Sequence, residues 1–169
     1  MSGSHAVAVL LEDRLATLTR AVGLIRRRNL PVQSLSVGPT GTPGLSRLTL
    51  MIDSDSGTAD RAAQHLQKVV GVRAAVAFAP GQGVARELAL VKVRAPRARY
   101  AELLDMAQLY HASVIDDASE AVILELSGTE PFVLSALRAL ERFEIIEVAR
   151  SGTVALESGT DLQSGIRHD

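Results

Sequence analysis

Few residues of this chain have the types and spacing that catalysis requires. The four histidines are scattered, and none has metal-ligand spacing to a second His, Asp or Glu. They are His5, His65, His111 and His168. The carboxylate pair Asp116-Asp117 lies where a predicted strand meets a turn, whereas acid–base catalysis needs a pocket that gives two carboxyl groups different environments. No serine lies in a nucleophile elbow, and no glycine-rich fingerprint leads from a strand into a helix. We therefore predict that the chain is not a catalyst on its own.

The residues best placed to bind a ligand lie at the start of a predicted helix. Loop 12–18 leads directly from an apolar strand into this helix. Free backbone N–H groups and the helix dipole at such an N-terminus can hold an anion, for example an amino-acid carboxylate. Asp13 is expected to cap the helix by accepting backbone hydrogen bonds.

Three consecutive arginines, Arg26, Arg27 and Arg28, end the same helix. They could form a site for an acidic partner. They could equally be a solvated last turn, because the helix dipole favours cations there. The sequence leaves both interpretations open.

Composition limits the class of protein. The chain has 169 residues, 47% of them hydrophobic, a net charge of −1 and no cysteine, which excludes disulfides and thiolate chemistry and fits a reducing cytoplasm. No apolar run is long enough to span a membrane and no export signal is present, so we predict a cytoplasmic protein that does not bind membranes. The near-neutral charge and the lack of stacking aromatic residues on the predicted strands argue against nucleic-acid binding.

The first part of the chain predicts the order βαββαβ. The expected elements are strand 6–11, a helix ending at 26–28, strand 32–37, loop 38–44, strand 46–53, helix 58–70 and strand 72–78. The inward positions of the two helices include Val22 and Val70. This is the ferredoxin-like plan, in which helices cover one face of an antiparallel sheet and leave the other available for a partner.

The pattern repeats after a linker at residues 80–85. The expected elements are strand 87–93, a helix opened by Pro96, strand 111–116, a turn at 117–120, strand 121–127, a helix after Pro131 and a final strand 145–156, interrupted near Gly152. We therefore predict an α+β protein with two tandem ferredoxin-like domains, at residues 5–79 and 86–156, followed by a disordered tail at 157–169. Each domain is small, so docking or oligomerisation is expected.

Four stretches match the pattern of a known family. The most specific are RELALVKVRAP at 86–96 and FEIIEVARSGTVAL at 143–156, and VQSLSVGPT at 32–40 and SRLTLMID at 46–53 also match. Over about residues 6–156 the chain resembles the small, regulatory subunit of acetohydroxyacid synthase (acetolactate synthase). In that family the first domain is an ACT domain, a ferredoxin-like module that binds an effector, and a second domain of related topology follows.

The resemblance implies a subunit without catalytic residues or cofactors of its own. Its partner would be the large subunit, which carries thiamine diphosphate, a divalent metal such as Mg²⁺, and FAD. Together they condense pyruvate with a second pyruvate or with 2-ketobutyrate in branched-chain amino-acid biosynthesis. The small subunit raises this activity and usually confers inhibition by valine. Valine would lie between the ACT domains of a homodimer, near the loop after the first strand and the start of the second.

The chain departs from the family at this effector site. The family loop typically reads Glu-Asn-x-Pro-Gly-Val-Leu, whereas Asp13, Leu15 and Ala16 replace its Asn, Pro and Gly here. A second family asparagine falls at Pro31. The resemblance carries the effector site onto Asp13, Leu15, Ala16, Thr17, Leu18, Pro31 and Val32.

Each replacement removes something that a zwitterion needs. Ala16 adds a methyl group and loses backbone freedom, Asp13 would repel a carboxylate, and Pro31 has no side-chain amide or backbone donor. Losing two or three polar contacts at about 1–3 kcal/mol each would weaken binding by several orders of magnitude. We therefore expect an activating subunit with weakened or absent valine response. Two alternatives remain: a site in which Asp13 and Arg14 bind a different amino acid, and a scaffold that acts without a large subunit.

Overall fold

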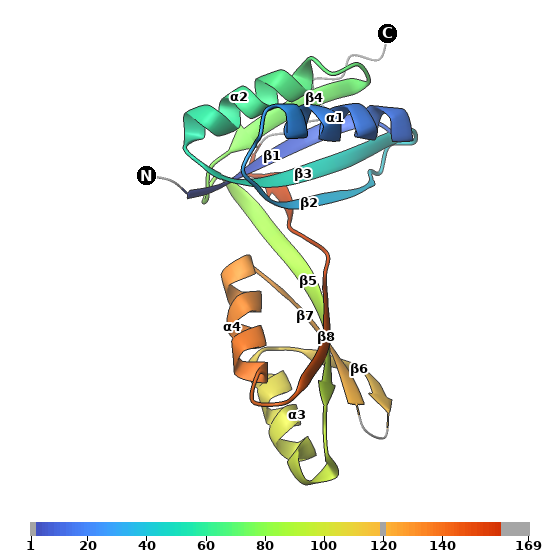
Figure 1. The fold of residues 1–169 in the computed structure, drawn as a ribbon, viewed down its shortest axis with the longest axis vertical. Helices are drawn as coiled ribbons and strands as arrows, with labels where there is room; N and C mark the ends of the chain where they lie inside the picture. The colour runs from blue at the N-terminus through green and yellow to red at the C-terminus, as the bar shows by residue number, and fades with distance from the viewer. Residues whose placement is uncertain (1–2, 119–120, 160–169) are drawn as a thin grey trace. The chain divides into compact units, whose positions relative to one another are not determined.

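The computed structural model describes residues 3–118 and 121–159, which form two compact units (Figure 1). Of the described residues, 3–85 and 153–159 belong to the first unit and 86–152 to the second. The elements are β1 (Gly3–Glu12), α1 (Leu15–Arg27), β2 (Val32–Pro39), β3 (Leu45–Ser54), α2 (Ser56–Gln67), β4 (Val72–Phe78), β5 (Gly83–Arg94), the 3-10 turn η1 (Arg97–Arg99), α3 (Tyr100–Leu109), β6 (Ser113–Ala118), β7 (Ala121–Gly128), α4 (Glu130–Leu140), β8 (Ile145–Arg150) and β9 (Val154–Glu157).

The first unit contains an antiparallel sheet in the order β2-β3-β1-β4, with α1 and α2 on one face (Figure 1). The strict alternation in β3 has the expected result, because Leu48, Leu50 and Ile52 are fully buried under the helices. Val7 and Val9 of β1 complete the centre of this core. The predicted α+β class with βαββαβ units is confirmed.

Two predicted core positions in the helices of this unit are wrong. Val22 is 41% exposed, because the inner stripe of α1 runs through Thr17, Ala21 and Ile25 and turns Val22 away from the sheet. Val70 is 74% exposed, because α2 starts at Ser56 and already ends at Gln67. The chain then turns at Gly71, whose φ of 92° favours glycine, and a Cβ atom there would collide with the side chain of Thr17.

The last strand of the chain covers part of the sheet face that was expected to be open. Ala155 of β9 is buried with Ala6, Ala8, Met51 and Phe78 on the face opposite the helices. Arg47 Nη2 also donates a 2.8 Å hydrogen bond to the carbonyl oxygen of Ala155.

The expected single strand 145–156 is therefore two strands, and residues 153–156 belong to the first unit rather than the second. Gly152, with φ of 72°, separates the strands in a conformation that other residues adopt at a cost. Two further boundaries differ from the expectation. β5 begins at Gly83, within the predicted linker, and β9 runs to Glu157, within the predicted tail. The rest of that tail beyond residue 159 lies outside the described residues.

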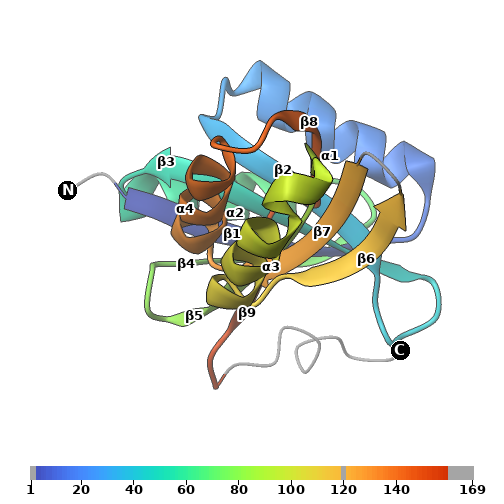
Figure 2. The ribbon, with the colours of Figure 1, turned by 90° about the horizontal axis from the view of Figure 1, so that it is seen from below.

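The second unit repeats the plan with the strand order β6-β7-β5-β8. Helices α3 and α4 lie on one face of this sheet (Figure 2) and close an aliphatic core around Phe143. The guanidinium of Arg99 stacks over that ring, 4.5 Å from its centroid. The predicted turn at 117–120 is wrong at Asp117 and Ala118, which end β6, and residues 119–120 lie outside the described range.

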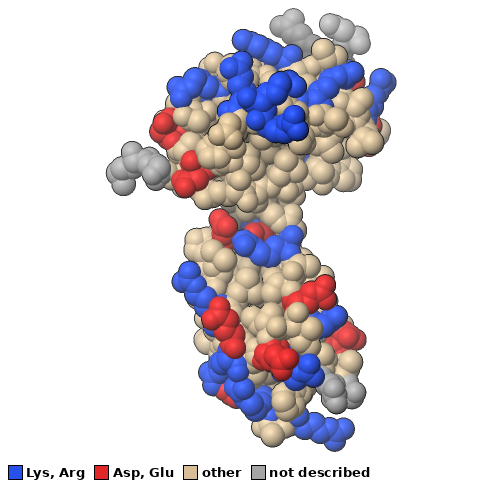
Figure 3. All heavy atoms as spheres, viewed as in Figure 1, with Lys and Arg blue, Asp and Glu red and all other residues tan. Residues whose placement is uncertain are grey.

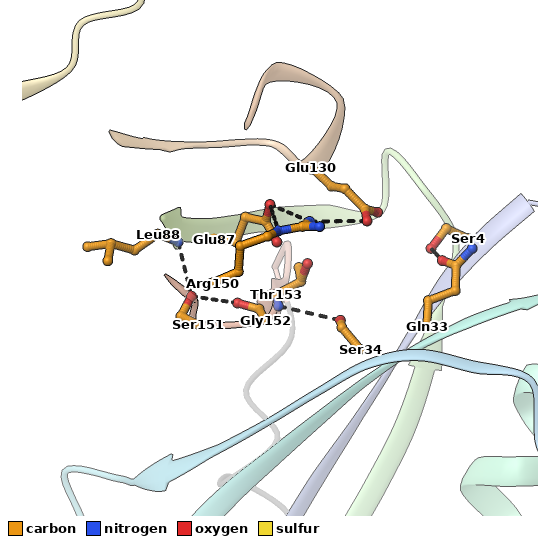
Figure 4. A network of polar contacts seen from close by, with 10 residues as sticks. All are labelled: Ser4, Gln33, Ser34, Glu87, Leu88, Glu130, Arg150, Ser151, Gly152 and Thr153. Atoms are coloured by element: carbon orange, nitrogen blue, oxygen red, sulfur yellow. Dashed lines mark hydrogen bonds and ion pairs between the residues drawn. The ribbon is translucent and has the colours of Figure 1, made fainter. Parts of the chain in front are cut away.

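An ion pair with a buried carboxylate joins two strands of the second unit. The side chain of Glu87 on β5 is 1% exposed, and its Oε1 accepts hydrogen bonds from Nε and Nη2 of Arg150 on β8 at 3.1 and 2.6 Å (Figure 4). Glu130, at the start of α4, lies 3.3 Å from the same Nη2. Burial alone would lower the pKa of Arg150, but the two carboxylates outweigh it and raise that pKa. The buried carboxylate of Glu87 is therefore compensated by the guanidinium of Arg150.

Candidate effector site

A pocket of about 430 Å³ opens in the first unit where the end of β1, the start of α1, the end of β2 and the start of β3 meet. Its lining is mostly apolar, with one acidic, one basic and one hydroxyl side chain. The lining residues are Leu11, Asp13, Arg14, Leu15, Leu18, Val37, Gly38, Pro39 and Ser46.

Asp13 anchors the loop that forms one wall of this pocket. Its backbone N–H donates to the carbonyl oxygen of Gly44 at 2.8 Å, and its Oδ1 accepts a 2.9 Å hydrogen bond from the hydroxyl of Ser46. The expected helix cap by Asp13 is wrong. The N-cap residue of α1 is Arg14, whose guanidinium has no acceptor for a capping bond. The Asp13 carboxylate is turned toward β3 instead.

The pocket combines features that suit a small molecule with separate charged and apolar parts. The first turn of α1 has neither a side-chain cap nor an acidic residue, so its N–H groups and dipole favour an anion. The Arg14 side chain adds a cation, and Asp13 an acceptor for a donor group such as an ammonium. Leu11, Leu18 and Val37 provide apolar walls.

The structure brings together only part of the effector site that the family pattern suggests. Asp13, Leu15 and Leu18 line the pocket, and Leu15 is 80% exposed. The other four predicted site residues are not in its lining. Ala16 is exposed, Thr17 is buried against Gly71, Pro31 is exposed with its carbonyl oxygen bound to Asp53 N–H at 3.1 Å, and Val32 packs against the core.

Five further pocket residues, Leu11, Val37, Gly38, Pro39 and Ser46, were not identified from the sequence. Ser46 faces Leu11 on one side and Pro39 on the other in the strand register, which places all three in one row across the sheet. The loop at 38–44 predicts that β2 and β3 pair as a hairpin, and this pairing would have identified Ser46 and Pro39 as neighbours. Arg14 also lines the pocket, and the sequence had indicated it in the alternative in which Asp13 and Arg14 bind a different amino acid.

Within residues 3–118 and 121–159, no three His, Asp or Glu side chains lie close enough together to hold a metal ion. No helix in the described part of the chain is long and apolar enough to cross a membrane.

Comparison with known proteins gives a consistent result for both units. Residues 7–74 match the ACT domain of the AHAS small-subunit type, and residues 86–159 match the family described as small subunit of acetolactate synthase. The acetolactate synthase small subunit of Mycolicibacterium smegmatis is 33% identical over 92% of this chain and 92% of its own length. The probable acetolactate synthase small subunit of Archaeoglobus fulgidus is 32% identical over 92% of this chain and 97% of its own length.

A solved structure agrees with these sequence matches. The crystal structure of the acetolactate synthase small subunit from Thermotoga maritima superposes with a TM-score of 0.86 at 28% identity, covering 94% of this chain and 99% of that one. The chain therefore belongs to the family of acetolactate synthase small subunits, the non-catalytic regulatory subunits of that enzyme.

Proposed function

We propose that this chain binds and activates the large, catalytic subunit of acetolactate synthase, and that its own response to valine is weakened or lost. One combination of observations carries the proposal. Family models match residues 7–74 and 86–159, while the segment at the start of α1 has Asp13, Leu15 and Ala16 where the family has Asn, Pro and Gly. The cofactors reside in the large subunit, where thiamine diphosphate, Mg²⁺ and FAD are the expected set.

The contacts of the loop support a weakened effector site. The Asp13 carboxylate hydrogen-bonds to Ser46 and lies in the pocket wall, so a valine carboxylate near it would meet a like charge. Asp13 also has no side-chain N–H to donate, unlike the asparagine it replaces. Ala16, in the first turn of α1, carries a methyl group that the family glycine lacks. These changes lie outside the buried core, so they alter the site without weakening the fold.

We further propose that the active form is a homodimer joined through its first units. β2 is an edge strand that pairs only with β3, so the backbone groups of its other side are unpaired within this sheet. Leu35 and Val37 on this strand are 39% and 45% exposed. An edge with exposed apolar side chains is stabilised by pairing with the same edge of a second copy.

The test of the activating role is reconstitution. The large subunit from the same organism is assayed for acetolactate formation alone and with increasing amounts of this chain. The proposal predicts a saturable rise in rate with a defined stoichiometry. No rise at saturating concentrations, with both proteins folded, would remove the subunit role.

A second candidate function keeps a working effector site with changed specificity. Arg14 and Asp13 both line the pocket, so they could hold the carboxylate and the ammonium of an amino acid other than valine. Calorimetric titration against a panel of amino acids decides this point, and heat for one of them would favour the sensor function. Co-purification of the large subunit with this chain from the native host would distinguish both functions from a scaffold that acts without a large subunit.

A further inference from the structure

The outer surface of the two helices in the first unit is rich in cations. Six basic side chains lie there, all exposed, and we call them the basic helix surface: Arg20, Arg26, Arg27, Arg28, Arg61 and Lys68. Figure 3 shows Lys and Arg atoms gathered over α1 and α2. α1 contains no acidic residue, and α2 contains only Asp60.

These six side chains form a group on one surface, and among residues 3–118 and 121–159 no salt bridge joins any of them to a carboxylate. Elsewhere, among the described residues, carboxylates pair with Arg73, Lys92, Arg94, Arg99, Arg142 and Arg150. In the described part of the chain, none of the six residues of the basic helix surface lies within salt-bridge distance of an Asp or Glu. Of the six, Arg61 has a carboxylate close enough to influence, since the pKa of Asp55 is lowered mainly by hydrogen bonds from Thr58 and also by the charge of Arg61.

The helix dipole explains part of this surface but not all of it. Arg26 and Arg27 are in the last turn of α1, where the dipole favours a cation. Arg20 and Arg61 lie in the middle of their helices, where the helix dipole does not stabilise a cation. Like charges crowded on one surface repel each other, so an unpaired cluster of this size is favoured when an anionic partner covers it.

Two of the guanidinium groups already lie close to their helices. A Cβ atom placed on Gly23 would be 3.5 Å from Nη1 of Arg27, and one placed on Gly57 would be 3.4 Å from Nη1 of Arg61. Arg61 Nη2 also donates a 2.8 Å hydrogen bond to the hydroxyl of Thr58. A side chain held by such a bond, as Arg61 is, loses less conformational freedom when it meets a partner.

We propose that the basic helix surface docks an acidic surface of the large subunit of acetolactate synthase. The inference rests on the proposed function, which supplies the partner, and adds where the partner binds and by which chemistry. Charge complementarity argues for an acidic protein surface, which speeds association and fixes orientation. α1 and α2 contain no aromatic side chain on which bases could stack, so single-stranded nucleic acid fits this surface less well.

The experiment compares two double variants of the full chain. Arg20→Glu with Arg27→Glu reverses two charges on the basic helix surface. Arg97→Glu with Arg138→Glu makes the same change in net charge at two exposed arginines of the second unit, and Arg138 is in a last helical turn, as Arg27 is. Circular dichroism checks folding, and the less severe pair Arg20→Gln with Arg27→Gln replaces the first variant if that one fails to fold.

Affinity for the large subunit is measured by surface plasmon resonance at low and high salt. The first variant is expected to bind roughly 10- to 100-fold more weakly at low salt, mainly through a slower association rate. The difference should shrink as salt screens the charges, and the second variant should bind like the wild type.

Three results would overturn the inference. Equal binding by both double variants and the wild type contradicts the docking surface and leaves the proposed function intact. No binding by the wild type contradicts both. Tight binding of a DNA duplex by the wild type, with unchanged affinity of the first variant for the large subunit, would assign the surface to nucleic acid.

Discussion

The side chain of Asp13 shows how a single residue can preserve a loop and change what the loop binds. Its backbone N–H and its carboxylate both hold the loop against the neighbouring β-hairpin, through Gly44 and Ser46. The same carboxylate places a negative charge in the wall of the pocket. The loop is thus stabilised by a residue that disfavours an anionic ligand.

The loop changes should be reversible. Replacing Asp13 by Asn, Leu15 by Pro and Ala16 by Gly restores the family pattern, so we expect valine inhibition of the reconstituted enzyme to appear or to strengthen by at least about tenfold, the effect of roughly 1.4 kcal/mol of regained contacts. The measurement is the valine concentration for half inhibition. Asp53→Asn, which removes one exposed carboxylate of the same unit, is the control and should leave this concentration unchanged. Unaltered insensitivity of the triple variant would contradict the assigned cause.

A second residue-scale prediction concerns pH. The Asp55 carboxylate caps α2 by accepting a 2.7 Å hydrogen bond from Thr58 N–H, and this bond holds the pKa of Asp55 below its ordinary value. A lowered pKa in the folded state means that the stabilisation is present above the ordinary Asp range and is lost as the pH falls through the folded-state value.

Asp55→Ala is therefore expected to lower the thermal unfolding temperature at pH 7, with a difference from the wild type that disappears at strongly acidic pH. Asp55→Asn keeps a neutral capping oxygen and is the control. Circular dichroism melts at several pH values measure the effect. If the difference in unfolding temperature between Asp55→Ala and the wild type stayed constant with pH, the charged form of Asp55 would not be what stabilises the helix start.

At the scale of elements, the sequence predicted the fold well where periodicity was strong. β3 alternates strictly, and its core residues Leu48, Leu50 and Ile52 are buried as expected. The helices were less predictable, because one-residue shifts in the inner stripe decide whether Val22 faces the sheet. The family pattern predicted three of the nine pocket residues, Asp13, Leu15 and Leu18.

The assignment of β9 to the first unit could not be read from local patterns. Its four residues extend a strand-like run in the sequence, and its pairing with β5, the turn at Gly152 and the contacts of Ala155 show where the strand packs. Those contacts join residues far apart in the chain, as the bond from Arg47 to the Ala155 carbonyl does. No short-range periodicity encodes such a pairing.

Because Ala155 is 3% exposed in an apolar cluster, Ala155→Asp should destabilise the first unit by about 2–4 kcal/mol, the cost of an uncompensated buried polar group. Val154→Asp, at a neighbouring position that is 53% exposed, should change stability by less than about 0.5 kcal/mol. Urea unfolding followed by circular dichroism compares the two. Equal stability of both variants would show that β9 does not pack on the sheet in solution.

At the scale of the whole molecule, the proposed homodimer gives a prediction about mass. Leu35→Lys places a charge on the exposed edge strand β2. The variant should therefore sediment as a monomer, or its dimer should dissociate at a higher protein concentration than that of the wild type. Leu109→Lys, at a position of α3 that is 66% exposed, is the control and should keep the mass of the wild type. Identical masses for all three proteins at every concentration would exclude the β2 edge as the interface.

The central claim is that the chain activates its catalytic partner and does so without the usual valine feedback. The most direct measurement is acetolactate formation by the large subunit, with and without this chain, over a valine titration that extends to millimolar concentrations. We predict a clear activation by the chain and a rate that stays nearly constant across the titration. Activation that valine abolishes in the micromolar to low millimolar range would contradict it, and so would the absence of activation.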